Sequence, residues 1–214
     1  ELIMFSSHSE FSPMAYMDFV QRLAHVAEIK EWDNRPHIHR IRRYVYFFAT
    51  KLDVPTQLAE NIAVASMLHD VGKATTPTEL LLKKGNYSHF EWQTMEHHTI
   101  DGSLILSKSS NDLIRIGHII ARSHHERWDG SGYPDGLKNS EIPIEARICA
   151  IADIFDALTS PRPYKAKMSE DNAYELIASS SGTLLDPKLV DIFVNDYNEI
   201  HRILKTNKTK PLTK

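Results

Sequence analysis

An apolar segment from Ile62 to Leu68 runs directly into the pair His69-Asp70. Such a segment belongs in the interior of a fold, so the side chains at its end lie where water is scarce. A histidine and an aspartate placed there can reach one divalent cation, because imidazole supplies a nitrogen ligand and carboxylate an oxygen ligand. Gly72 permits a tight backbone exit, and Lys73 places a cation beside any anion that the metal holds. The alternative is a buried histidine that only hydrogen-bonds its neighbour, and this pair alone does not decide between the two.

Apolar residues recur at helical spacing along most of the chain, and no stretch shows the alternation of a strand. We therefore expect an all-α bundle, with an N-terminal helix and a loop rich in glycine and proline at 126–136. The helices are expected at about 14–30, 37–54, 57–70, 90–106, 113–125, 143–158, 169–180 and 187–204, with a short helical piece at 79–82.

The 214 residues, 42% hydrophobic and 25% charged, are typical of a globular domain, and the net charge of −3 does not indicate a surface for nucleic-acid polymers. We expect a linker and helix at 1–32 that can end an upstream module, a domain at 33–204 and a polar tail at 205–214. The helix at 14–30 could pair with its copy in a homodimer. One cysteine, Cys149, excludes an internal disulfide and favours a reducing, cytoplasmic location. No apolar run reaches the ~18 residues that span a membrane.

The chain contains 12 histidines, and several stand at or near the ends of successive expected helices. A bundle can bring such positions together in its interior. Asp153 is the most informative of the accompanying carboxylates, because it lies inside the apolar segment 148–155 and is costly to bury unless it is paired or bound to metal. A set of imidazoles and carboxylates suits Fe, Mn or Zn better than Ca or Mg. The candidate ligands are His37, His69, Asp70, His98, His124, His125 and Asp153.

Two motifs together resemble those of a known family. His69-Asp70 with Gly72-Lys73 is similar to the signature of the HD superfamily of metal-dependent phosphohydrolases. The run HHERWDGSGYP at 124–134 resembles the extended motif of the HD-GYP family, bacterial phosphodiesterases that act on the second messenger cyclic di-GMP. The similarity continues in family order through 142–148, 153–160 and 162–165, and covers about residues 33–195.

The resemblance implies two or three divalent metals, commonly iron or manganese, held by the candidate ligands with Asp70 bridging. In trinuclear members the position four before the first histidine is usually glutamate and helps to bind the third metal. This chain has Asp33 there, a shorter carboxylate, so the third metal stays open. The family's phosphate-contacting cations fall on Lys73, Arg162 and Lys165.

The implied reaction is hydrolysis of cyclic di-GMP to pGpG by a water that the metals activate, and whether hydrolysis continues to GMP is left open. Two alternatives stay open: a catalytically weak receptor or interaction module, and a phosphodiesterase for another cyclic dinucleotide such as cyclic GMP-AMP. In the family, the loop Gly132-Tyr133-Pro134 is linked to site shape and to contact with GGDEF proteins. Tyr133 and Asp156 are further candidates for substrate contact, and Tyr133 can either stack on guanine or only brace its loop.

Two further interpretations concern neighbouring residues of one type. His97 and His98 point about 100° apart on one helix, and the family pattern selects His98 as the ligand. The cationic run Arg40, Arg42 and Arg43 is interpreted as a solvated helix face rather than an RNA site.

Overall fold

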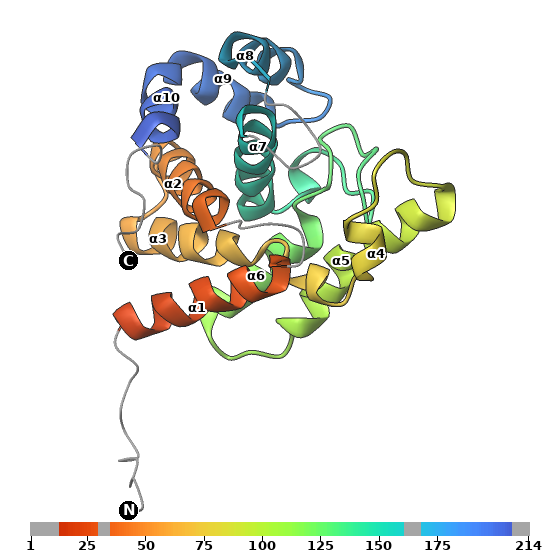
Figure 1. The fold of residues 1–214 in the computed structure, drawn as a ribbon. Helices are drawn as coiled ribbons and strands as arrows, with labels where there is room; N and C mark the ends of the chain where they lie inside the picture. Colours follow the sequence, from red (N-terminus) through yellow and green to blue (C-terminus); the bar gives the residue numbers. More distant parts are fainter. Residues whose placement is uncertain (1–12, 30–34, 161–167, 207–214) are drawn as a thin grey trace, which may run out of the picture.

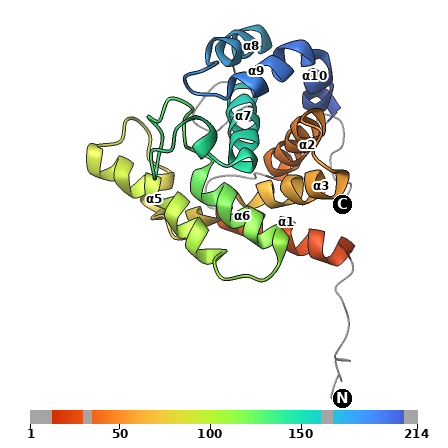
Figure 2. The same ribbon diagram turned by 180° about the vertical axis from the view of Figure 1, so that it is seen from behind.

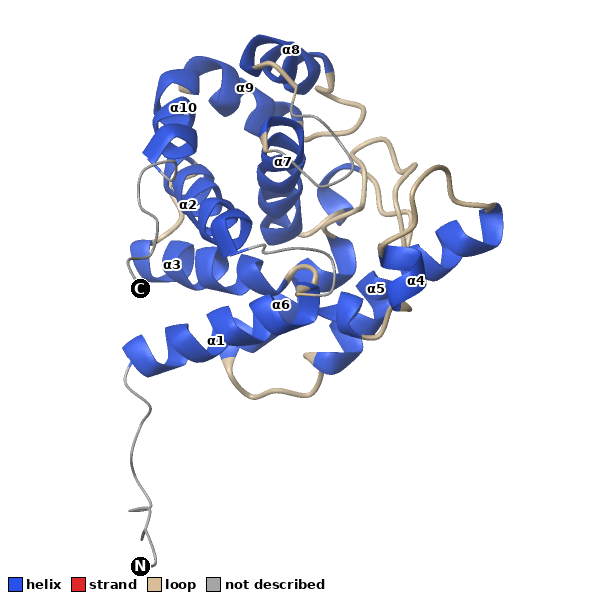
Figure 3. Ribbon diagram, in the orientation of Figure 1, coloured by secondary structure: helices blue, strands red, loops and turns tan. Residues whose placement is uncertain are grey.

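The structure, a computed structural model, describes residues 13–29, 35–160 and 168–206. Within these ranges every regular element is helical, apart from one isolated β-bridge between Ser181 and Leu185, which confirms the expected all-α fold (Figure 3). No described helix combines the length and the apolar character needed to cross a bilayer. In chain order the elements are α1 (Pro13–Glu28), α2 (Arg35–Lys51), α3 (Thr56–Ala65), η1 (Ser66–Leu68), η2 (Val71–Ala74), α4 (Thr78–Leu81), α5 (His89–Ile105), α6 (Asp112–Ser123), η3 (Asn139–Glu141), α7 (Ile144–Thr159), α8 (Glu170–Ser179), α9 (Pro187–Asn195) and α10 (Tyr197–Thr206), where η marks a 3₁₀ turn.

The core forms where α2, α3, α6 and α7 meet. α2 packs on α3 and α7, and α6 packs on α3, α5 and α7 (Figures 1 and 2). Tyr44 and Phe48 of α2 are buried with Phe155 of α7, and the rings of Tyr44 and Phe155 meet edge to face at 5.6 Å. Burying a large apolar side chain contributes roughly 1.5–3 kcal/mol, so this contact holds α2 against α7.

Helix α1 lies under the segment that carries His69 and Asp70. It buries Val20, Ala24 and Ala27 in the common core and contacts both η1 and η2. Helix α1 therefore covers both η1 and η2, while α5 packs on η2.

The structure corrects the helix expected near the end of the domain. The segment 187–204 was predicted to be continuous, whereas it breaks at Asp196 into α9 and α10. Buried Phe193 and Ile200 stand one heptad apart, so the apolar spacing runs unchanged through the break. Asp196 leaves helical geometry (φ −112°, ψ 21°), and its carboxylate lies 2.7 Å from Lys51 Nζ on α2. A tertiary contact, which periodicity does not reveal, accompanies this break.

Candidate metal centre

His69 and Asp70 lie between two 3₁₀ turns and not on an α-helix that continues to residue 70, as had been expected. Helix α3 ends at Ala65, and η1 and η2 follow it. Asp70 has φ −100° and ψ 13°, in the sparsely populated bridge region where many active-site residues are found. Both side chains are buried, and the change of winding sets them on the inner side of the bundle.

Gly72 allows η2 to approach α5 closely. A Cβ atom on Gly72 would lie 1.9 Å from the carbonyl oxygen of His98 and 2.5 Å from the backbone nitrogen of Gly102. No side chain fits into that space, so residue 72 must be glycine because the backbones of η2 and α5 are in contact there. The approach brings His98 beside Asp70.

The first cluster of possible ligands contains Asp70, His98, His124 and His125, whose ligand atoms lie within 4.8 Å of one another. Asp70 Oδ1 is 3.3 Å from His98 Nε2 and 3.7 Å from His124 Nε2. The ring of His125 is centred 4.0 Å from that of His124. Two atoms bonded to one ion at ~2.1 Å lie about 3.0–4.2 Å apart, so these separations suit a shared metal.

The second cluster contains His37, His69 and Asp153, contributed by α2, the η1–η2 junction and α7. Asp153 Oδ1 lies 3.8 Å from His37 Nε2 and 4.0 Å from His69 Nε2. The other oxygen of Asp70, Oδ2, is 3.3 Å from His69 Nε2. Asp70 therefore stands between the clusters, with one carboxylate oxygen towards each.

Backbone carbonyls set the orientation of three of these imidazoles. A carbonyl oxygen only accepts, so the Nδ1 atom that faces it carries the proton and donates. The Nε2 atom then keeps its lone pair, which is the form that binds a metal. Nδ1 of His69, His98 and His124 lies 2.9, 2.6 and 3.0 Å from the carbonyl oxygens of Ser66, Met95 and Ile120, respectively.

Several polar atoms that face this centre are buried and have no hydrogen-bond partner within the described residues. Among the described residues, Nε2 of His98, Nε2 of His124 and Oδ1 of Asp70 have no hydrogen-bond partner. Leaving one such polar atom unpaired in an interior costs about 1–3 kcal/mol. A divalent cation would satisfy all three, because each offers a lone pair. The donor set therefore fits a metal.

The electrostatics of the centre favour the protonation states that a metal requires. Burial lowers the pKa of His124, and burial together with the neighbouring His124 lowers the pKa of His125 well below its usual value. Burial alone would raise the pKa of Asp70, yet Lys73, whose Nζ is 2.8 Å from Oδ2, and His69 outweigh it and hold that pKa well below its usual range. The centre thus offers neutral imidazoles and an ionised carboxylate.

Asp156 lies behind His37 and away from the centre. Its Oδ2 is 2.7 Å from His37 Nδ1, and Arg40 donates to both of its oxygens, from Nε at 2.5 Å and from Nη2 at 2.9 Å. The side chain of Asp156 is only 1% exposed. The predicted substrate contact of Asp156 does not fit this position, because a fully engaged, buried carboxylate orients His37 instead.

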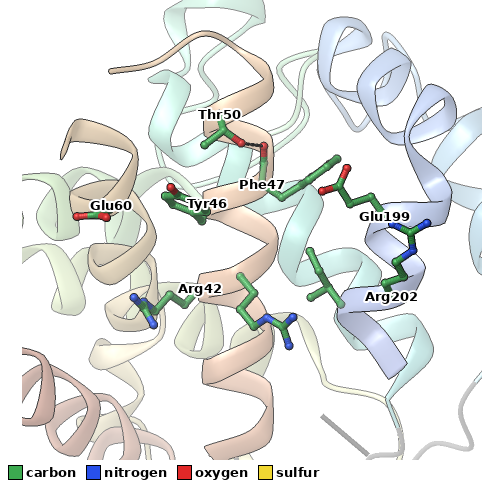
Figure 4. Close-up of a pocket in the computed structure, with 9 residues that line it drawn as sticks. Arg42, Tyr46, Phe47, Thr50, Glu60, Glu199 and Arg202 are labelled. Atoms are coloured by element: carbon green, nitrogen blue, oxygen red, sulfur yellow. Dashed lines mark hydrogen bonds between the residues drawn. The ribbon is translucent and has the colours of Figure 1, made fainter. Parts of the chain in front are cut away.

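The position of Arg40 corrects the interpretation of Arg40, Arg42 and Arg43 as one solvated helix face. Arg40 is buried against Asp156 and Ser160 and is not part of a solvated face. Arg42 and Arg43 point to another side of α2, where they line a pocket of about 450 Å³ between α2 and α10 (Figure 4). Residues close together in sequence thus serve two different surfaces of one helix.

Replacing Asp156 with asparagine is expected to weaken metal binding about 10- to 100-fold and to destabilise the fold by about 3–5 kcal/mol. The amide cannot hold the charge of Arg40, and loss of a buried partner and of a ligand's hydrogen-bond support has these typical costs. Chelator competition and thermal unfolding measure the two effects. Ser160→Ala removes a neutral hydroxyl that accepts from Arg40 and donates to Asp156 at 3.3 Å; it leaves the charges of the network in place, so it is the control and should change both values far less. Wild-type metal affinity in Asp156→Asn would contradict the orienting role.

Glu126 anchors the loop that follows His125, a role that the sequence analysis missed. It is 3% exposed, and its carboxylate accepts hydrogen bonds from the backbone N–H groups of Asp135 at 2.8 Å and Leu137 at 3.1 Å. Arg122 of α6 holds the Asp135 carboxylate through two contacts of 2.7 Å. An acidic residue directly after two candidate ligands was the available signal, but its partners are backbone groups with no sequence signature.

The anchored loop presses Tyr133 against the first cluster. The ring of Tyr133 is centred 4.9 Å from that of His125 and 6.4 Å from that of His98. Gly132 makes this possible, because a Cβ atom there would lie 2.3 Å from the backbone nitrogen of Arg127. Tyr133 therefore borders the centre. Three predicted site residues, Asp33, Arg162 and Lys165, lie outside the described residues.

Comparisons with known proteins find relatives of this chain. The HD domain family matches residues 20–189. The chain is 39% identical over 184 residues to the cyclic di-GMP phosphodiesterase response regulator RpfG of Xanthomonas campestris, covering 86% of this chain and 49% of that protein. It is 37% identical over 197 residues to a cyclic di-GMP phosphodiesterase of Thermotoga maritima, covering 90% and 54%. A 3'3'-cGAMP-specific phosphodiesterase of Vibrio cholerae is 37% identical over 182 residues, covering 85% and 35%.

Two solved structures share the fold. A cyclic GMP-AMP specific phosphodiesterase of V. cholerae matches with a TM-score of 0.63 at 19% identity, covering 91% of this chain and 51% of that chain. A protein of Bdellovibrio bacteriovorus, described as HDG"Y"P, matches with a TM-score of 0.58 at 18% identity, covering 86% and 60%. The chain spans about half the length of the two cyclic di-GMP phosphodiesterases that it matches.

Proposed function

This chain belongs to the HD domain family, and on that basis we propose that it hydrolyses cyclic di-GMP to pGpG, and onward to GMP, in bacterial second-messenger signalling. The observation that carries the proposal is the position of Asp70, whose two oxygens face two clusters of imidazoles and carboxylates. The identity to two cyclic di-GMP phosphodiesterases supports the choice of substrate.

We propose that the clusters bind two iron or manganese ions, with Asp70 as the shared ligand. A neutral imidazole set with two carboxylates suits these metals. When bound, such ions supply Lewis-acid chemistry, polarising a phosphoryl oxygen and lowering the pKa of a water. A third ion would need Asp33, which lies outside the described residues.

The chain's own residues orient the centre and offset charge. Lys73, 15% exposed at its side chain and next to Asp70, brings an ammonium group to the edge of the first cluster, where it would offset charge on a phosphodiester oxygen. Asp156 holds the tautomer of His37, and the Glu126-anchored loop places Tyr133 beside His125. From their match to the family, Arg162 and Lys165 are proposed to contact phosphate.

A second substrate, cyclic GMP-AMP, is a specific alternative, because a V. cholerae relative named for it is 37% identical. The catalytically weak receptor is less favoured, since every candidate ligand in the described residues lies in one of the two clusters. Contact of the Gly132-Tyr133-Pro134 loop with GGDEF proteins, and pairing into a homodimer, stay predictions.

The function is tested by counting metals and following both dinucleotides on one anaerobically purified sample. We expect two or three metals per chain, and conversion of cyclic di-GMP faster than of cyclic GMP-AMP. His98→Ala should lose at least about 100-fold in turnover, since it removes a ligand from the first cluster. His89→Ala, at the exposed start of the same helix, is the matched control and should retain wild-type activity. Full metal loading without hydrolysis of either dinucleotide would overturn the proposal.

A further inference from the structure

A pocket of about 650 Å³ opens beside the first cluster. Its walls come from the turn after η2, from one face of α5 and from the loop that carries Tyr133; the residues used below are Thr75, Phe90, Gln93, Glu96, Asp101 and Tyr133. Tyr133 is shared, because it lines the pocket and also lies 4.9 Å, ring to ring, from His125. A ligand in the pocket would therefore adjoin the metal centre.

Two aromatic residues, Phe90 and Tyr133, line the pocket. Phe90 is 76% exposed although it is a large apolar residue, and Tyr133 is only partly buried. The exposed ring of Phe90 offers a stacking surface to any nucleobase. Stacking alone does not select one base, because every base has a π-face.

Two polar residues on α5 can discriminate between the nucleobases. Gln93 and Glu96 are three residues apart, so they share one face of the helix, and both line the pocket. Within the described part of the chain, the carboxylate of Glu96 takes part in no ion pair or hydrogen bond. Asp101 differs, because Thr75 Oγ1 donates to its Oδ2 at 2.7 Å. Glu96 is thus an acceptor group that is open to a ligand.

We propose that this pocket binds a guanine base of the cyclic dinucleotide, with Glu96 accepting hydrogen bonds from guanine N1–H and the exocyclic amine. The inference rests on the proposed function and names its specificity determinant. An ionised carboxylate only accepts, so it matches the two donors of guanine and opposes the N1 acceptor of adenine. Gln93 can donate its amide N–H to guanine O6.

The test compares the binding of GMP and AMP to the metal-loaded chain by equilibrium dialysis. Both ligands carry the same sugar and phosphate, so a difference between them reports the base. We expect GMP to bind at least about tenfold more tightly than AMP, as charge-assisted hydrogen bonds typically give. In Glu96→Gln, that ratio should fall to about one or invert, because glutamine offers a donor and an acceptor as adenine does.

Two further variants separate base reading from general disruption. Asp101→Asn removes the same charge from the same pocket and should leave the GMP-to-AMP ratio within about twofold. Phe90→Ala should weaken GMP and AMP equally, by about tenfold, because stacking does not distinguish them. Equal binding of GMP and AMP to the wild type, or an unchanged ratio in Glu96→Gln, would overturn the guanine pocket.

Activity measurements distinguish a failure of the guanine-pocket proposal from a failure of the proposed function. Glu96→Gln should shift the preference between cyclic di-GMP and cyclic GMP-AMP towards the latter. If the wild type hydrolyses cyclic di-GMP but Glu96→Gln keeps its preference, only the pocket is rejected. If the wild type hydrolyses no cyclic dinucleotide yet prefers GMP to AMP, only the proposed function is rejected.

Discussion

Asp70→Asn is expected to lose bound metal from both clusters and to hydrolyse cyclic di-GMP at least about 10³-fold more slowly than the wild type. The side chain keeps its size but replaces a carboxylate oxygen with an amide nitrogen, which donates and does not bind a cation. Because one oxygen of Asp70 faces each cluster, a single substitution reaches both. A 10³-fold loss corresponds to about 4 kcal/mol, within the several kcal/mol that metal ions supply to phosphoryl chemistry.

The measurement is elemental analysis together with chromatography of the nucleotide products. Asp53→Asn is the matched control, because Asp53 is exposed in the turn after α2 and its positive φ of 57° suits asparagine as well as aspartate. This control should keep its metals and its turnover. Wild-type metal content in Asp70→Asn would remove the bridging role of Asp70, even if activity were lost.

Gly72→Ala is expected to destabilise the protein by about 3 kcal/mol or more and to displace His98 from its cluster. The added methyl group would meet backbone atoms of His98 and Gly102, which cannot turn aside as a side chain can. η2 must then move away from α5, and Asp70 moves with it. For a chain of this size, 3 kcal/mol lowers the melting temperature by about 6–12 °C.

Thermal unfolding of the metal-free protein measures the fold separately from the metal, and metal affinity then reports the displaced ligand. Gly117→Ala is the control, since its Cβ atom would meet the flexible side chains of Leu106 and Leu68 at 3.3 and 3.4 Å. It lies inside α6, where alanine favours the helix, so we expect a change within about 1 kcal/mol. Equal melting temperatures for Gly72→Ala and the wild type would show that η2 and α5 do not need this contact.

Much of the candidate centre was predictable because its residues stand in motifs. A carboxylate inside the apolar run around Asp153 carries its own signal, since burial is costly without a partner. The structure places that side chain next to His37 and His69. The structure buries His98 in the first cluster and leaves His97 exposed, and the choice of His98 as a ligand stays a prediction.

Other features had no signal along the chain. In the sequence, Arg40 cannot be distinguished from its neighbours Arg42 and Arg43. Only the packing of α2 on α7 places it against Asp156. The break at Asp196 is hidden by a spacing that continues through it. Glu96 is one of many acidic residues until α5, the turn after η2 and the Tyr133 loop enclose it in a pocket.

The sequence by itself therefore determined the class of fold, the helices that carry the centre and the identity of its candidate ligands, because helical periodicity and residue chemistry are local properties. The tertiary structure alone decided which oxygen of Asp70 faces which cluster, which nitrogen of each imidazole is directed inwards and which polar residues stand behind them. These depend on contacts between segments far apart in the chain, and such contacts are selected by the packing of the whole bundle.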